Sequence, residues 1–242
     1  MSPAETPVQS TRLLVSVRDP AEAVLAADCG ADLVDAKDPD RGALGALPPG
    51  IVSAIAADVR TNPNSPLVSA VAGEPRGVAE LASSLGALAP AGADLLKVAL
   101  PAGIWSEPDM LRPALAHAGV PVIAVFFAED GPEPSILPSV ARAGFAGAMI
   151  DTRIKDGTSL PDLLPPERLA GFVAGCREAG LISGLAGSLR IADIAALARH
   201  GPSYLGFRGG LCASSNRGLA LDGGRIREAA ARLTETGRRE AA

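Results

Sequence analysis

The stretch Cys29-Gly-Ala-Asp-Leu-Val-Asp-Ala-Lys-Asp38 contains a helix stop followed by a short apolar strand that ends in charged residues. Gly30 ends an Ala-rich segment that opens at Asp19-Pro20, and residues 32–37 predict a strand. The same order recurs along the chain: a short apolar run, an amphipathic Ala-rich segment, and a Gly that ends it. The runs are apolar on both faces, which is typical of the buried strands of a parallel sheet.

This alternation predicts eight strands and eight helices. The strands are expected at residues 13–17, 32–37, 67–71, 94–100, 122–127, 147–151, 181–185 and 204–208. The helices are expected at 19–30, 49–59, 78–90, 107–117, 134–142, 166–179, 189–200 and 224–236. Eight such units in about 230 residues predict an α/β fold, a single (β/α)8 TIM barrel. A doubly wound open sheet is the alternative, but it usually has fewer strands, and no G-x-G-x-x-G follows the first strand.

Composition narrows the class of protein. Of the 242 residues, 48% are hydrophobic and 20% are charged, as in an ordinary globular chain. The net charge is −5 with no basic stripe, so we expect no nucleic-acid partner. No apolar run reaches about 18 residues, so no membrane span is expected. Three cysteines without ligand spacing indicate neither a disulfide framework nor a metal site.

The first residues differ from the rest of the chain. Residues 1–11 are polar, carry two prolines and lack the apolar core of an export signal. We therefore expect a disordered tail at 1–11, a barrel domain at 12–237 and a cytoplasmic protein. The oligomeric state stays open between a monomer and a homo-oligomer.

Lysine is rare in this chain: there are three, against nineteen arginines among the 22 basic residues. Lys37, Lys97 and Lys155 each lie at or just past the end of a predicted strand, the second, fourth and sixth. Arg keeps its proton near neutral pH, whereas Lys loses it once desolvation or a neighbouring cation lowers its pKa. The three lysines therefore indicate amine chemistry.

In a TIM barrel the active site forms at the carboxyl ends of the strands, and alternate strands share layers of side chains. Asp35 and Lys37 are two residues apart on one strand, so both can point into the barrel. Asp151 ends the sixth strand, and Lys155 follows it in the loop. We expect a polar ring of three amines and two carboxylates. A purely structural network of ion pairs is the alternative, although Arg serves a static network better than Lys.

Two Gly-rich loops follow the seventh and eighth strands, where TIM barrels often bind phosphate. Gly lets the backbone approach an anion, a Ser hydroxyl donates a hydrogen bond, and Arg offers a planar fork. We expect phosphate to bind the residues Gly187, Ser188, Arg208, Gly209 and Gly210. For the loop 38–45 after the second strand, three roles stay open: a lid over the site, a second contact to an anion, or a plain turn.

Six segments across nearly the whole chain resemble the (5-formylfuran-3-yl)methyl phosphate synthases, also called 4-(hydroxymethyl)-2-furancarboxaldehyde-phosphate (4-HFC-P) synthases. They are residues 30–39, 42–45, 96–98, 149–157, 185–188 and 206–210. The specific parts are the Asp-x-Lys of Asp35 and Lys37, and the Asp-Thr-x-x-Lys-Asp-Gly of residues 151–157. Residues 126–135 do not match the family's pattern.

The resemblance implies a TIM barrel that condenses two molecules of glyceraldehyde 3-phosphate to the furan of methanofuran-type cofactors in C1 metabolism. It implies no cofactor and no metal. By resemblance, Lys37 forms a Schiff base with a triose carbonyl, and Lys97 accepts a proton. Asp35, Asp151 and Lys155 complete the proton-transfer set.

Two other functions stay open at this point. A class I aldolase or transaldolase-like enzyme shares the Schiff-base lysine and the phosphate site, but it stops at a linear sugar phosphate. A non-catalytic sensor of phosphorylated metabolites uses the same site for binding alone.

Overall fold

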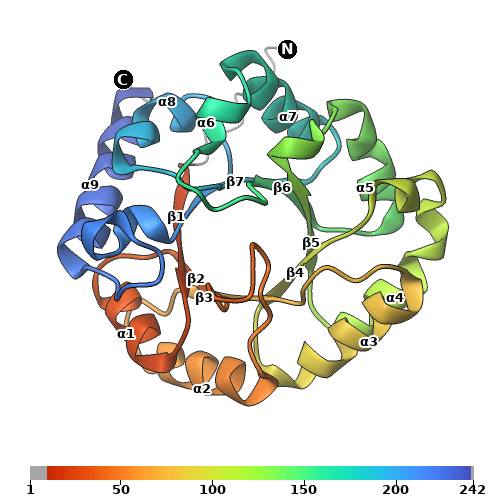
Figure 1. Ribbon diagram of the computed structural model, residues 1–242, viewed down its shortest axis with the longest axis horizontal. Helices are drawn as coiled ribbons and strands as arrows, with labels where there is room; N and C mark the ends of the chain where they lie inside the picture. The colour runs from red at the N-terminus through yellow and green to blue at the C-terminus, as the bar shows by residue number, and fades with distance from the viewer. Residues whose placement is uncertain (1–9, 241–242) are drawn as a thin grey trace, which may run out of the picture.

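The computed structural model, which describes residues 10–240, is a closed barrel of eight parallel strands in the order β1 to β8 (Figure 1). Each strand pairs with the next, and β1 closes the ring by pairing with β8, where Val15 lies opposite Phe207. The strands are β1 (Arg12–Val17), β2 (Leu33–Ala36), β3 (Leu67–Val71), β4 (Leu95–Ala99), β5 (Val122–Phe127), β6 (Gly147–Asp151), β7 (Ile182–Leu185) and β8 (Tyr204–Phe207). The predicted TIM barrel is confirmed. The tail expected at 1–11 lies, as far as residue 9, outside the described residues.

Helices surround the strands (Figure 1). They are α1 (Pro20–Asp28), α2 (Pro49–Arg60), α3 (Val78–Leu88), α4 (Arg112–Leu115), α5 (Leu137–Ala143), α6 (Leu160–Leu163), α7 (Pro166–Glu178), α8 (Ile194–Ala198) and α9 (Gly223–Glu240). The predicted start of the first helix is observed, because the Asp19 carboxylate caps α1 by accepting a hydrogen bond from the Glu22 N–H at 2.8 Å. No helix within residues 10–240 is long and apolar enough to cross a membrane.

The expected continuous helix at 107–117 is wrong. That region is a series of short turns: the 3-10 helix Pro108–Met110, the four-residue α4 and the 3-10 helix Ala116–Ala118. Pro108 and Pro113 lack the N–H group that continues a helix, so each begins a new turn instead. The short α6 was not expected either; Leu164 and Pro165 separate it from α7, which begins at Pro166.

Inside the barrel, the side chains are apolar toward the amino ends of the strands and polar toward the carboxyl ends. Leu14 on β1 and Leu33 on β2 belong to a buried cluster that fills the barrel together with Tyr204. Side chains two residues further along each strand point the same way, and there the residues are Ser16 and Asp35. The polar positions therefore gather at the carboxyl ends of the strands, as the sequence predicted. A second buried cluster packs the outer faces of the strands against the helices.

An ion pair between Glu22 of α1 and Arg208 reinforces the closure of β8 on β1. The side chains are only 10% and 7% exposed, and both guanidinium Nη atoms donate to the carboxylate. Burial alone raises the pKa of the Glu22 carboxyl, but Arg208, with help from Arg18, outweighs burial and holds that pKa below its usual value. The pair joins residues that are 186 positions apart in the chain.

We predict that Glu22→Gln lowers the free energy of unfolding by about 3 kcal/mol at pH 7, since it leaves the Arg208 charge buried without a counterion. Because the folded state depresses the carboxyl pKa, the wild-type advantage is complete above about pH 5 and shrinks as the pH falls through the folded-state pKa. Urea unfolding of both proteins between pH 3 and 8 measures this. The control is Glu228→Gln, whose pair with Arg232 is about half exposed; it costs about 0.5 kcal/mol. Equal losses in the two variants would contradict the assignment.

Candidate active site

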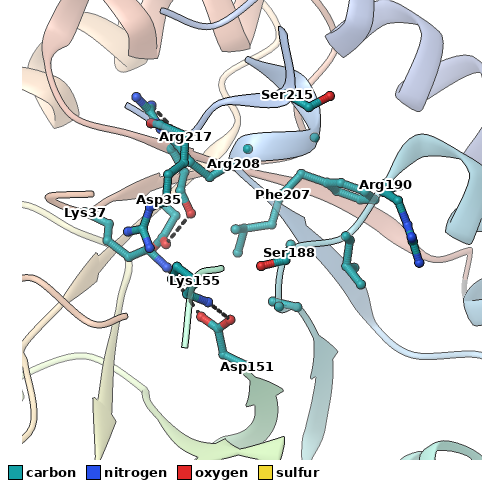
Figure 2. Close-up of a pocket in the computed structure, with 18 of the residues that line it drawn as sticks. Asp35, Lys37, Asp151, Lys155, Ser188, Arg190, Phe207, Arg208, Ser215 and Arg217 are labelled. Atoms are coloured by element: carbon teal, nitrogen blue, oxygen red, sulfur yellow. Dashed lines mark hydrogen bonds and ion pairs between the residues drawn. The ribbon is translucent and has the colours of Figure 1, made fainter. Parts of the chain in front are cut away.

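A cavity of about 480 Å³ opens at the carboxyl ends of the strands. All ten residues that the sequence predicted for catalysis or phosphate binding line it (Figure 2). The expected polar ring of amines and carboxylates is therefore present. Its members come from β2, β4, β6 and the loop after β6, as the placement of the three lysines predicted.

Asp35 and Lys97 form a deeply buried pair at the base of the cavity. Lys97 Nζ lies 2.6 Å from Asp35 Oδ1, and both side chains are almost fully excluded from solvent. The Asp35 carboxylate also accepts hydrogen bonds from Ser69 Oγ at 2.7 Å and from Ser16 Oγ at 3.0 Å. These contacts fix the position of Asp35 and leave Lys97 with one strong partner.

Asp151 lies between the other two amines. Lys155 Nζ donates to Asp151 Oδ1 at 2.6 Å and to Thr152 Oγ1 at 3.0 Å, whereas Lys37 Nζ is 3.4 Å from Asp151 Oδ2. Figure 2 shows the Lys155 and Asp151 side chains directed at one another in the cavity. Lys37 thus makes the longest contact of the three lysines, which leaves its amine the least constrained.

The surroundings of the site lower the pKa values of two amines and of one carboxylate. Burial lowers the pKa of Lys97, and Asp35 offsets this only in part. Burial also lowers the pKa of Lys155; Asp151 opposes this decrease, and the Lys37 cation adds to it. Burial alone raises the pKa of Asp151, but Lys155 and Lys37 hold it well below its usual range. The cavity therefore contains a carboxylate that favours its ionised form and two amines, those of Lys97 and Lys155, that lose a proton more readily than a surface lysine does.

Residues at the end of β5 and just after it hold the loop that carries Lys155. Glu129 accepts hydrogen bonds from the backbone N–H groups of Arg153 at 2.8 Å and Ile154 at 2.9 Å. The Arg153 guanidinium lies 4.1 Å from the centre of the Phe127 ring and pairs with Asp130. Residues 127–130, in the region that does not match the family's pattern, thus position the loop after β6.

The loops after β7 and β8 meet at the cavity wall with their backbones close together. Gly187 has φ +114°, and a Cβ there would lie 2.6 Å from Thr152 Cγ2. A Cβ on Gly210 would lie 2.2 Å from the Leu189 carbonyl oxygen. Ser188 adopts φ +48°, a left-handed conformation that is strained for a residue with a Cβ. Close packing therefore requires glycine at positions 187 and 210. Ser214 and Ser215 in the loop after β8 share the left-handed conformation of Ser188, with φ +53° and +55°.

The fork that the sequence analysis expected Arg208 to offer phosphate is already occupied, which corrects that expectation. Its two Nη atoms bind Glu22 and the carbonyls of Ser16 and Leu219, and its Nε donates to the Arg217 carbonyl at 3.1 Å. All five N–H groups thus have protein acceptors. Arg208 lines the cavity, but its side chain fixes the loop that carries Gly209 and Gly210.

The lining or supporting residues that sequence reasoning missed include Ser16, Ser69 and Arg217. The two serines interrupt apolar strands at inward positions, a signal that the period-two pattern of the strands contained. Arg217 lies in the loop between β8 and α9, and only its place on the active face of a barrel marked it. Within the described residues, no group of three or more His, Cys, Asp and Glu side chains is placed to hold a metal.

Solved structures with this fold include the 3-hexulose-6-phosphate synthase of Salmonella typhimurium, which is 18% identical with a TM-score of 0.65. The alignment covers 93% of this chain and 100% of that one. The phosphoribosyl anthranilate isomerase of Thermus thermophilus is 15% identical with a TM-score of 0.63, over 93% of this chain and 99% of that chain. At these identities the similarity shows the barrel fold alone.

Sequence comparison identifies closer relatives. A protein of Methylorubrum extorquens, named provisionally as a (5-formylfuran-3-yl)methyl phosphate synthase, is 51% identical over 96% of this chain and 95% of its own length. The (5-formylfuran-3-yl)methyl phosphate synthase of Methanococcus maripaludis strain C5 is 36% identical over 85% of this chain and 91% of its own length. A sequence model of the family described as 4-HFC-P synthase matches residues 13–230. The chain therefore belongs to the 4-HFC-P synthase family.

Proposed function

We propose that this enzyme condenses two molecules of glyceraldehyde 3-phosphate to (5-formylfuran-3-yl)methyl phosphate through a Schiff base on Lys37, for the synthesis of a methanofuran-type cofactor. The reaction balances without an oxidant or a reductant. Two C3H7O6P units lose one phosphoric acid and two waters to give C6H7O6P. The observation that carries the proposal is the convergence of three amines and two carboxylates in one cavity beside two Gly-rich loops.

Lys37 is the amine best suited to attack a carbonyl. Lys97 and Lys155 each lie 2.6 Å from a carboxylate oxygen, whereas Lys37 lies 3.4 Å from its nearest one. The neutral Lys37 amine adds to the triose carbonyl, and loss of water gives a protonated imine. The imine withdraws electrons from the adjacent carbon, which can then lose a proton, attack a second aldehyde or expel phosphate. Water hydrolyses the final imine and regenerates Lys37.

The ionisable side chains around the imine carry out the proton transfers. The lowered pKa of Lys97 favours its neutral form, which is the form that accepts a proton from carbon. The negative charge of Asp35 stabilises the ammonium that forms when Lys97 accepts a proton, and Asp151 does the same for Lys155. These contacts support the assignment of Lys97 as base, with Asp35, Asp151 and Lys155 completing the relay.

The phosphate of one substrate fits the backbone of the β7 and β8 loops. None of the hydrogen bonds within residues 10–240 uses the N–H groups of Ser188, Gly209 or Gly210. In Figure 2 the Ser188 hydroxyl faces the cavity, whereas Arg190 points away from it. Backbone N–H groups and a hydroxyl of this kind bind phosphate oxygens. Arg208 contributes by holding the second loop in place.

Lys37→Arg keeps a positive charge but removes the nucleophile, since Arg stays protonated. We predict that borohydride with glyceraldehyde 3-phosphate adds the mass of a reduced triose adduct to Lys37 of the wild type, located by peptide mapping. Lys37→Arg is expected to form no adduct and to lose turnover entirely while unfolding at the wild-type temperature. Substantial activity in this variant would refute the Schiff base and leave Lys37 an electrostatic role. A wild type that gains no mass would favour a metabolite sensor.

The product distinguishes the furan synthase from an aldolase. Incubation with glyceraldehyde 3-phosphate is expected to give a chromophore in the near ultraviolet, because a furan aldehyde is conjugated. One inorganic phosphate appears for every two triose phosphates consumed. A linear sugar phosphate formed without release of phosphate would assign the chain to the class I aldolases instead. Lys37→Arg serves as the matched blank.

Lys97→Gln separates the base from the nucleophile. The amide still donates a hydrogen bond to Asp35 but accepts no proton, so kcat is expected to fall by about 10²- to 10⁴-fold. Lys37 in this variant is still trapped by borohydride. Loss of the adduct together with turnover, in a variant that remains folded by circular dichroism, would show that Lys97 is needed to form the imine.

A further inference from the structure

Arg217 is a cation in the cavity wall whose hydrogen-bonding capacity is mostly unused. It lies in the loop between β8 and α9 and lines the cavity with Lys37 and Lys155. Its Nη2 donates to the Gly42 carbonyl at 3.0 Å, and its Nε is buried with no acceptor. No other hydrogen bond from its guanidinium occurs in the described part of the chain. Within the described residues, four of its five N–H groups therefore have no hydrogen-bond acceptor.

The charges that line the cavity also favour an anion beside Arg217. The cavity is lined by six cations, namely Lys37, Lys97, Lys155, Arg190, Arg208 and Arg217, but by only three carboxylates, those of Asp35, Asp151 and Asp156. Arg208 pairs with Glu22, and Arg190 pairs with Asp162 and Asp193. Within residues 10–240, no carboxylate oxygen lies within ion-pair distance of Arg217, and burial lowers the pKa of its guanidinium. Asp151 and Asp40 stabilise its charge only from beyond that distance, so a bound anion would add a direct counterion.

The Arg217 side chain begins beside the first phosphate site, because a Cβ on Gly209 would lie 3.6 Å from Arg217 Cβ, but its guanidinium extends to the loop after β2. Figure 2 shows Arg217 near Arg208 and Lys37, with Ser188 on the other side of the cavity. The Gly42 carbonyl belongs to the loop after β2, so Arg217 bridges the mouth between the β8 and β2 loops. Condensing two triose phosphates requires two anion sites at once, and the loops after β7 and β8 supply one.

We propose that Arg217 binds the phosphate group of the second triose phosphate, at a subsite beside the 38–45 loop. An arginine fork suits this role because it can make two parallel hydrogen bonds to phosphate oxygens. The alternative is that Arg217 only ties the two loops together through its contact with Gly42. The identity of the ligand as a triose phosphate rests on the function proposed above, whereas the anion site itself does not.

Titration calorimetry with inorganic phosphate tests the site without any turnover. The wild-type chain is expected to bind two phosphate ions, and Arg217→Gln is expected to bind one of them about 10- to 100-fold more weakly. The control, Arg232→Gln, removes the same charge from the surface of α9 and keeps both sites. A wild type with a single phosphate site, or unchanged affinities in Arg217→Gln, would overturn the proposal. If that variant does not fold, Arg217→Lys keeps the charge without the fork; equal affinities there would also overturn it.

A second measurement links the site to the reaction. In Arg217→Gln the first triose is still trapped on Lys37 by borohydride, whereas furan formation needs about 10- to 100-fold more glyceraldehyde 3-phosphate. Loss of trapping together with product would show that Arg217 acts at the first site, against the proposal. If the wild type itself forms neither adduct nor furan, the proposed function fails, and the phosphate titration alone decides whether Arg217 is an anion site.

Discussion

The buried carboxylate of Asp35 joins four consecutive strands at the mouth of the barrel. Ser16 of β1 and Ser69 of β3 donate hydrogen bonds to it, and Lys97 of β4 pairs with it. A charge in this position is tolerated only because each oxygen has a partner. Lys97 is held in turn, and its amine stays in a desolvated environment. The chemistry of the site depends on this arrangement, since an amine in open water would keep its proton.

The sequence revealed the barrel and the convergence of the lysines because both follow from periodicity. Strand residues two apart share a face, so the positions of Asp35 and Lys37 were readable once the strand was recognised. The irregular region at 108–118 could not be read in this way, because its two prolines, Pro108 and Pro113, allow several combinations of short turns. Nor could the partner of Arg208: Glu22 lies 186 residues away, and no local pattern connects the two. Arg217 lies in a loop, where side-chain direction follows from the folded backbone alone.

The barrel does not itself decide the chemistry. Two solved structures that share it are named for other activities, an isomerase and a hexulose phosphate synthase, at 15% and 18% identity. What separates this chain from them lies at the strand ends and in the loops that follow. Glu129 and Arg153 illustrate the point, because two neighbouring loops brace one another and thereby set the position of Lys155. Such contacts lie outside the framework that the fold requires.

The closure of β8 on β1 also has a consequence for the order of events in the cell. A ribosome makes Lys37 early and Arg208 late, and translation runs from the N-terminus. Until β8 emerges, β1 has an open edge and the walls formed by the last loops do not exist. Under the proposed mechanism, Lys37 in a nascent chain therefore lacks the phosphate-binding loops that would hold a substrate carbonyl beside it. On that proposal, the chain acquires its activity only after β8 and the loop that follows it have been made.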